Sequence, residues 1–207
     1  DGVMASEGGG YGGGQKCGKG VRKRDGAKGC WEAIEEMARG EQEIMVGCSE
    51  GEAIINYMNK LKPERTPALI FSGTGYQPGK EFADKRIADY KKYGIDFRWR
   101  YTFDDLSPAF RATPLATFFA DMFCERNKFG DIDSIIHQFE AHAAPNPEDH
   151  EAKIACPSII LTGSEDNTHP KAFPLQERIK NCELKVLPGA GHACQTEQPL
   201  LFKRPMI

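Results

Sequence analysis

Ser49 is the residue of this sequence whose surroundings most strongly indicate chemistry. It lies at the centre of residues 47–51, Gly-Cys-Ser-Glu-Gly, which fit G-x-S-x-G, the pattern of a nucleophile elbow. In such an elbow a strand turns sharply into a helix and exposes the serine hydroxyl, and the two glycines let the backbones pass closely. The flanking residues agree, because 43–46 predict a short buried strand and 53–61 predict a helix with an apolar face.

Two further residues have types that could activate this serine. A serine hydroxyl becomes a good nucleophile only when a base accepts its proton and a third group orients that base. Asp166 follows a strand expected at 156–163, and His192 follows a strand expected at 184–187. Taken singly, an aspartate in a turn and a histidine in a loop are ordinary residues. Their joint placement after successive strands, downstream of Ser49, favours a catalytic set.

The elements that must position these residues alternate between strand and helix on both sides of a long helical segment. This alternation predicts the fold class α/β, with a mostly parallel sheet flanked by helices. Residues 76–151 break the alternation, because they are mostly helical in pattern and rich in aromatic side chains. The expected helices are 25–39, 53–61 and 173–180, and the expected strands are 3–6, 43–46, 67–72, 156–163 and 184–187.

Composition narrows the class of protein. The 207 residues, 40% of them hydrophobic and 28% charged, are typical of one globular domain, and the net charge of −3 predicts neither a nucleic-acid nor a membrane partner. No apolar run long enough for a membrane span or a signal peptide is visible. Seven scattered cysteines without a C-x-x-C pair favour reduced thiols in the cytoplasm over disulfides or a zinc site. We therefore expect neither a metal nor a cofactor.

These motifs, taken together, resemble the α/β-hydrolase family, and the resemblance covers nearly the whole chain. Residues 47–75 are similar to the elbow, helix and following strand of cap-bearing members. Residues 156–170 look like the strand end that carries the catalytic acid, and residues 186–199 look like the histidine loop. Residues 3–14 look like the strand and glycine-containing loop that lie two elements before the nucleophile.

The resemblance implies a role for each candidate residue. Ser49 matches the nucleophile, His192 matches the general base, and the backbone N–H of Glu50 would donate one hydrogen bond to the oxyanion. Asp166 matches the orienting acid better than its neighbour Glu165. Cys48, beside the nucleophile, is interpreted as a buried packing residue.

The chain departs from the family pattern in two places. Glu52 stands where a small residue usually follows the elbow, although its charge suits a helix N-terminus. The first residue, Asp1, already belongs to the region after the earliest strands and after the loop that supplies the second oxyanion donor. We therefore expect an N-terminally incomplete hydrolase, with core segments at 1–75 and 152–207 and a helical cap at 76–151.

The expected activity is serine hydrolysis through an acyl-enzyme. The substrate would be a small ester, lactone or thioester, or the C–C bond of a diketone-like acid, and the aromatic cap favours an apolar or aromatic molecule. Within the cap, residues 118–123 are expected to form a buried aromatic stripe. The alternative is a non-catalytic ligand-binding or interaction protein with the same fold. Residues 8–20 fit nucleotide-binding glycine patterns only loosely, and the oligomeric state stays open.

Overall fold

The computed structural model describes residues 23–37, 41–73, 79–143 and 153–206. The strand expected at 3–6 and the glycine-rich segment at 7–20 lie outside these ranges, so the hypotheses attached to them, including nucleotide binding, stay predictions. Within the described ranges, every helix is too short or too polar to traverse a lipid bilayer.

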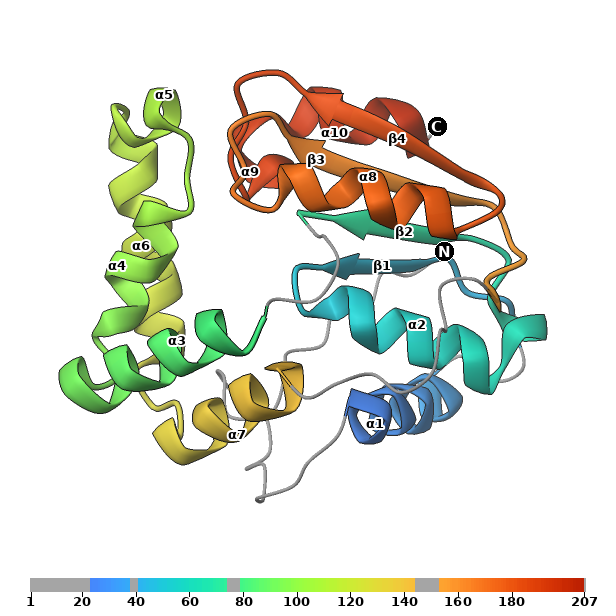
Figure 1. Ribbon diagram of the computed structural model, residues 1–207, viewed down its shortest axis with the longest axis horizontal. Helices are drawn as coiled ribbons and strands as arrows, with labels where there is room; N and C mark the ends of the chain where they lie inside the picture. The colour runs from blue at the N-terminus through green and yellow to red at the C-terminus, as the bar shows by residue number, and fades with distance from the viewer. Residues whose placement is uncertain (1–22, 38–40, 74–78, 144–152, 207) are drawn as a thin grey trace.

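Four strands form one parallel sheet, as the alternating pattern predicts. They are β1 (Met45–Cys48), β2 (Leu69–Ser72), β3 (Ser158–Gly163) and β4 (Cys182–Leu187), and they lie in this order across the sheet (Figure 1). The register places Gly47 of β1 opposite Phe71 of β2, and Phe71 opposite Ile160 of β3. All four strands therefore end at the same edge of the sheet.

The two central strands explain the continuous apolar runs of the sequence. Along β2, Leu69 and Phe71 point to one face of the sheet and Ile70 to the other, and all three side chains are buried. In β1 and β4 buried side chains are interspersed with exposed ones. A parallel strand that is covered on both faces needs apolar residues at every position, whereas an outer strand does not.

Helices cover both faces of the sheet. α1 (Lys23–Met37), α2 (Gly51–Leu61) and α8 (His169–Arg178) enclose the larger core with one face (Figure 1). α9 (Cys194–Glu197) and α10 (Pro199–Lys203) lie on the other face, over a smaller core that contains Leu161 and Cys194. Short 3₁₀ turns, η1 (Pro63–Arg65) and η3 (Arg204–Met206), end α2 and α10.

Trp31 is the main anchor of α1 on α2. Its ring is buried, and its Nε1 donates a 3.0 Å hydrogen bond to the carbonyl of Met58. Lys62 and Arg65 lie over the ring at 5.1 and 5.2 Å, and both contact the Glu35 carboxylate at 2.6 and 2.8 Å. Because Glu35 and Lys62 are partly exposed, burial of the indole contributes more than these ion pairs.

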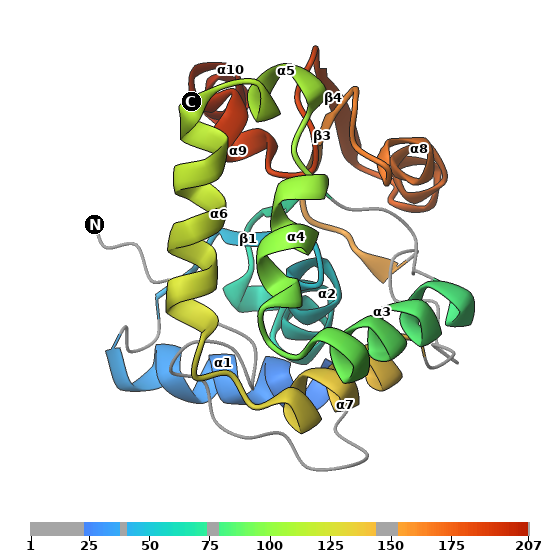
Figure 2. The same ribbon diagram turned by 90° about the vertical axis from the view of Figure 1, so that its left-hand side faces the viewer.

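A helical insertion separates β2 from β3 in the sequence, where the cap is expected. Its described helices are α3 (Lys80–Tyr93), α4 (Phe97–Asp104), α5 (Pro108–Arg111), α6 (Pro114–Asn127) and α7 (Ile132–Ala143). α4, α5 and α6 stand beside the carboxyl ends of the strands, and α3 and α7 lie below them (Figures 1 and 2). Tyr90, Phe97 and Phe139 belong to a separate hydrophobic cluster within the insertion. The boundaries of a cap domain at 76–151 remain a prediction.

The expectation of a buried stripe at 118–123 is wrong for Phe118 and Met122, whereas Phe119 and Phe123 are half-buried. Phe118 and Met122 of α6 are 66% and 48% exposed. The apolar residues that α6 buries are instead Ala116 and Ala120, on another side of the helix. α6 contacts α4 and α5, and small side chains allow such helices to approach closely. Phe118 and Met122 are consequently left on the outer side.

Candidate active site

The residues predicted to do chemistry follow the carboxyl ends of three parallel strands. Ser49 comes directly after β1, Asp166 follows β3, and His192 follows β4. Because these strands run in one direction, their ends meet at one edge of the sheet, which faces α4 and α5 (Figure 1). This edge is where ligands bind in open parallel sheets.

Ser49 occupies a sharp turn with an unusual backbone. Among the described residues it is the one non-glycine residue with a positive φ, 53°. Its N–H donates a 2.9 Å hydrogen bond to the carbonyl of Ser72, and α2 begins two residues later at Gly51. The left-handed conformation costs a residue with a Cβ atom on the order of 1–2 kcal/mol, so the surrounding fold must hold it. This geometry is that expected of a nucleophile elbow.

Only the first glycine of the motif is required by close packing. A Cβ atom on Gly47 would lie 2.6 Å from the carbonyl oxygen of Gly51, which no side chain can avoid. A Cβ atom on Gly51 would meet nothing within 4 Å. Cys48 also differs from expectation, because it is exposed and not buried. Side chains alternate along β1, and Met45 and Gly47 occupy the buried positions.

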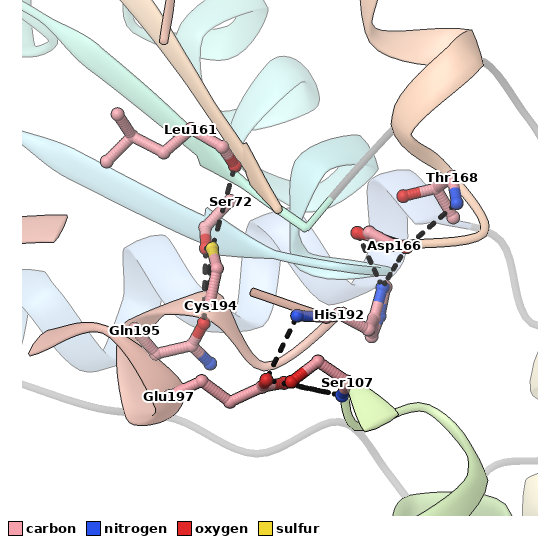
Figure 3. Close-up of polar contacts among 10 residues, drawn as sticks. Ser72, Ser107, Leu161, Asp166, Thr168, His192, Cys194, Gln195 and Glu197 are labelled. Carbon is pink, nitrogen blue, oxygen red and sulfur yellow. Dashed lines mark hydrogen bonds and ion pairs between the residues drawn. The ribbon is translucent and has the colours of Figure 1, made fainter. Parts of the chain in front are cut away.

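Asp166 and His192 are in direct contact. Both carboxylate oxygens of Asp166 lie 3.1 Å from Nδ1 of His192, and Oδ1 also accepts the N–H of Thr168 at 2.8 Å (Figure 3). The Asp166 side chain is buried, whereas the neighbouring Glu165 is exposed. Of the two adjacent carboxylates, the structure therefore brings Asp166 to the histidine.

The contact changes the proton affinity of both partners. Burial opposes ionisation of Asp166, but the hydrogen bonds from His192 and Thr168 hold the pKa of this carboxyl below its usual value. Burial likewise opposes charging of His192, but the Asp166 carboxylate raises the pKa of the imidazole above its usual value. The pair therefore favours an ionised aspartate that stabilises a protonated histidine.

Gly73 brings the histidine loop close to the serine turn. It has a φ of 53°, and a Cβ atom on it would lie 2.5 Å from the His192 carbonyl oxygen and 3.4 Å from Nδ1. The preceding residue, Ser72, accepts the Ser49 N–H. The serine turn and the histidine loop therefore meet at residues 72 and 73. The described contacts include no hydrogen bond between Ser49 and His192, so a complete triad stays a prediction.

The start of α2 carries two glutamates beside the serine. Glu50 precedes the first residue of the helix, where N–H groups have no partner within the helix, and its role as oxyanion donor stays a prediction. Burial raises the pKa of the Glu50 side chain to about 7, although Lys23 and Arg98 oppose this shift. Glu52 is buried in the first turn, so the helix forms with this residue in place.

Sequence reasoning did not find the contacts that the helical insertion makes with the histidine loop. The backbone N–H of His192 donates a 2.9 Å hydrogen bond to the carbonyl of Asp105, which follows α4. The Glu197 carboxylate accepts hydrogen bonds from the N–H groups of Ser107 and Gly191. No spacing in the sequence signals these contacts, because residues 105–107 lie more than 80 positions before the histidine loop.

Metal ligation finds no support in the same region. No group of three or more His, Cys, Asp or Glu side chains in the ranges that the structure describes could hold a metal ion. The expectation that the reaction needs no metal or cofactor rests on the sequence and stays a prediction.

Comparison with known proteins finds solved structures of similar fold but low sequence identity. No protein-family model matches the sequence, and a search of curated proteins found no relative. Among solved structures, an esterase from Exiguobacterium antarcticum superposes with a TM-score of 0.83 at 18% identity, over 96% of this chain and 77% of the esterase.

Two further solved structures agree with this similarity. The enol-lactonase from Burkholderia xenovorans LB400 has a TM-score of 0.83 at 13% identity, and covers 96% of this chain and 76% of the lactonase. A bromoperoxidase from Bacillus anthracis has a TM-score of 0.84 at 14% identity, with coverage of 96% and 77%. The parallel sheet and these superpositions together show that the chain has the α/β-hydrolase fold.

Proposed function

We propose that the protein is a serine hydrolase that acts through a covalent acyl-enzyme on a small ester, lactone or thioester. The observation that carries the proposal is the partly buried hydrogen bond between Asp166 and His192, at the sheet edge where Ser49 stands in a strained turn. An aspartate on Nδ1 fixes the histidine tautomer that leaves Nε2 free to accept a proton, which is what a serine nucleophile requires.

In the acylation step, Ser49 Oγ attacks the carbonyl carbon of the substrate and its proton passes to Nε2 of His192. The carbonyl oxygen, which becomes negatively charged, accepts a hydrogen bond from the backbone N–H of Glu50. The intermediate then collapses, the bond to the leaving oxygen or sulfur breaks, and the imidazolium returns its proton to that atom. Asp166 remains ionised throughout and stabilises the imidazolium.

Deacylation repeats the same steps with water as the nucleophile. His192 accepts a proton from the water, whose oxygen attacks the acyl carbon, and Ser49 leaves with that proton. The products are a carboxylic acid and the free enzyme. Water is the only reactant consumed besides the substrate, and every proton passes between the substrate, water, Ser49 and His192.

The similarity to an esterase and an enol-lactonase supports a carbonyl substrate of small size. An apolar or aromatic substituent is favoured by α4, which carries Trp99, Tyr101 and Phe103 and reaches the site at its C-terminal end. Asp105 follows this helix directly and contacts His192. In this proposal the C-terminal end of α4 lies beside the substrate, because Asp105 contacts the histidine loop.

A fluorophosphonate probe tests the proposal, because it reacts covalently with activated serines. The native protein should become labelled, and Ser49→Ala should abolish the labelling. Cys48→Ala is the matched control, since the adjacent thiol is exposed and could react in place of the serine. Labelling that persists in Ser49→Ala would overturn the assignment. A native protein that is never labelled would instead favour the non-catalytic ligand-binding alternative.

A further inference from the structure

The Glu197 carboxylate joins the helical insertion to the histidine loop. Its Oε2 atom accepts the N–H of Gly191 at 3.0 Å and the N–H of Ser107 at 3.2 Å, and Oε1 lies 3.3 Å from the same Ser107 nitrogen. Figure 3 shows the carboxylate of Glu197 directed at Ser107, beside His192. A single acidic group therefore holds backbone donors from segments that are 84 residues apart.

The two segments also contact each other directly. The His192 N–H donates to the Asp105 carbonyl at 2.9 Å. A Cβ atom on Gly191 would lie 2.5 Å from the nitrogen of Ser107 and 2.8 Å from the carbonyl oxygen of Asp105, so only glycine permits this approach. Residues 105–107 and 191–192 thus form a continuous contact, which we call the cap–histidine contact.

We propose that Glu197 is a positioning residue, which orients His192 by fixing its backbone to the helical insertion. This inference rests on the proposed function. Asp166 holds the imidazole at one atom, Nδ1, and this contact does not fix the backbone of the histidine loop. The cap–histidine contact fixes the loop itself, and the base is therefore held at both its ring and its backbone.

The chemistry of the contact explains why an acceptor is needed at position 197. Ser107 and Gly191 are both buried, so their N–H groups would have no ready access to water if the carboxylate were removed. One or both segments would have to move to satisfy these donors. Because the same oxygen accepts both, a movement of residues 105–107 would be transmitted to the residue next to the base.

Three substitutions separate this role from a general contribution to folding. Glu197→Ala removes the acceptor. Glu197→Asp keeps the charge but withdraws the carboxylate by one methylene, whereas Glu197→Gln loses the charge but keeps a carbonyl oxygen at full reach. Glu177→Ala, an exposed glutamate of α8, is the control for loss of a negative charge elsewhere on the fold.

The first measurement is the rate at which the fluorophosphonate labels Ser49. A displacement of about 1 Å can cost roughly 10²-fold in rate, so we expect labelling of Glu197→Ala and Glu197→Asp to slow by about 10- to 100-fold. Glu197→Gln should stay within about threefold of the native rate, because it restores the acceptor. A general folding defect would not distinguish Glu197→Asp from Glu197→Gln in this way.

The second measurement is amide hydrogen exchange, which does not depend on activity. Glu197→Ala should speed exchange in peptides that cover 104–108 and 189–193, while peptides of α8 stay at the native rate. Native labelling rates in Glu197→Asp, or exchange that is unchanged in both segments, would overturn the inference. If the native protein is not labelled at all, the proposed function fails, and exchange alone decides whether Glu197 holds the two segments together.

Discussion

Asp166 holds His192 through both of its carboxylate oxygens, each 3.1 Å from Nδ1. The aspartate is 4% exposed, and a backbone N–H of Thr168 fixes it from the other side. Because the carboxylate is buried and held on two sides, its negative charge stays beside the imidazole. Ionisation of the histidine is therefore tied to the aspartate.

The first prediction concerns this pair. A general base must be neutral to accept a proton, so kcat/KM should rise with pH as His192 deprotonates. Because Asp166 raises the pKa of His192, the midpoint of the rise should lie above the ordinary value of 6.5. Asp166→Asn should lower the plateau by roughly 10⁴-fold and move the midpoint to lower pH. A pH profile of ester hydrolysis or of probe labelling measures both effects.

Glu165→Gln is the matched control for that experiment, since among the described contacts the exposed Glu165 carboxylate accepts from Ser164 and none joins it to the histidine ring. It should preserve both the plateau and the midpoint. A midpoint that Asp166→Asn leaves in place would show that the aspartate does not control ionisation of His192.

The second prediction separates the two glycines of the elbow. Gly47→Ala should lower the free energy of unfolding by about 2–3 kcal/mol, because its methyl group would meet the backbone of Gly51 at 2.6 Å. Gly51→Ala should be neutral or slightly stabilising, because the space around it is open and alanine favours the helix. Denaturant unfolding of the two variants measures the difference, and equal stability of the two would contradict the steric argument.

The third prediction is that Glu50 destabilises the fold at high pH. Its pKa is raised from 4.5 to about 7 by burial, so the folded state retains the proton between these values while the unfolded state releases it. The free energy of unfolding should consequently fall as pH rises from 4.5 to 7. Glu50→Gln stays neutral, and should exceed the native stability by on the order of 2–3 kcal/mol at pH 8.

A comparison of Glu50→Gln with the native protein at low pH is the control for this prediction. At pH 4.5 and below, both states of the native protein are largely protonated at Glu50, so the native protein and Glu50→Gln should unfold at nearly the same denaturant concentration. Lys23 and Arg98 oppose the shift, and a stability difference that does not change with pH would mean that they compensate the burial completely.

Much of the fold follows from local patterns that a single sequence displays. The apolar run at 67–72 predicts a strand that is covered on both faces, and β2 is such a strand. Its observed bounds, Leu69–Ser72, differ from the prediction by two residues at one end. α8 begins at His169, four residues before the expected start, because Pro170 occupies a first-turn position where its missing N–H costs nothing. Local boundaries depend on such details more than on hydrophobic periodicity.

Errors arose where neighbours from elsewhere in the chain decide the outcome. Phe118 and Met122 have the spacing of a buried stripe, but α6 turns its small Ala116 and Ala120 inward. Periodicity identifies an apolar side of a helix, but it cannot say which side the partner helices cover. Cys48 is exposed for the same reason, since side chains alternate along β1 and the elements packed on the sheet cover the face that Met45 and Gly47 occupy.

The sequence by itself singles out Ser49, Asp166 and His192 as candidate site residues and fixes their chain order, because an elbow motif and strand ends are local features. The resemblance already favours Asp166 over Glu165, but only the tertiary structure shows that Asp166 contacts the histidine and that Glu197 ties its loop to Ser107. The physical reason is that hydrogen bonds are directional and short, while sequence patterns specify only the element and the side from which a residue starts. Which groups meet across 90 residues is set by how the sheet and the helical insertion pack.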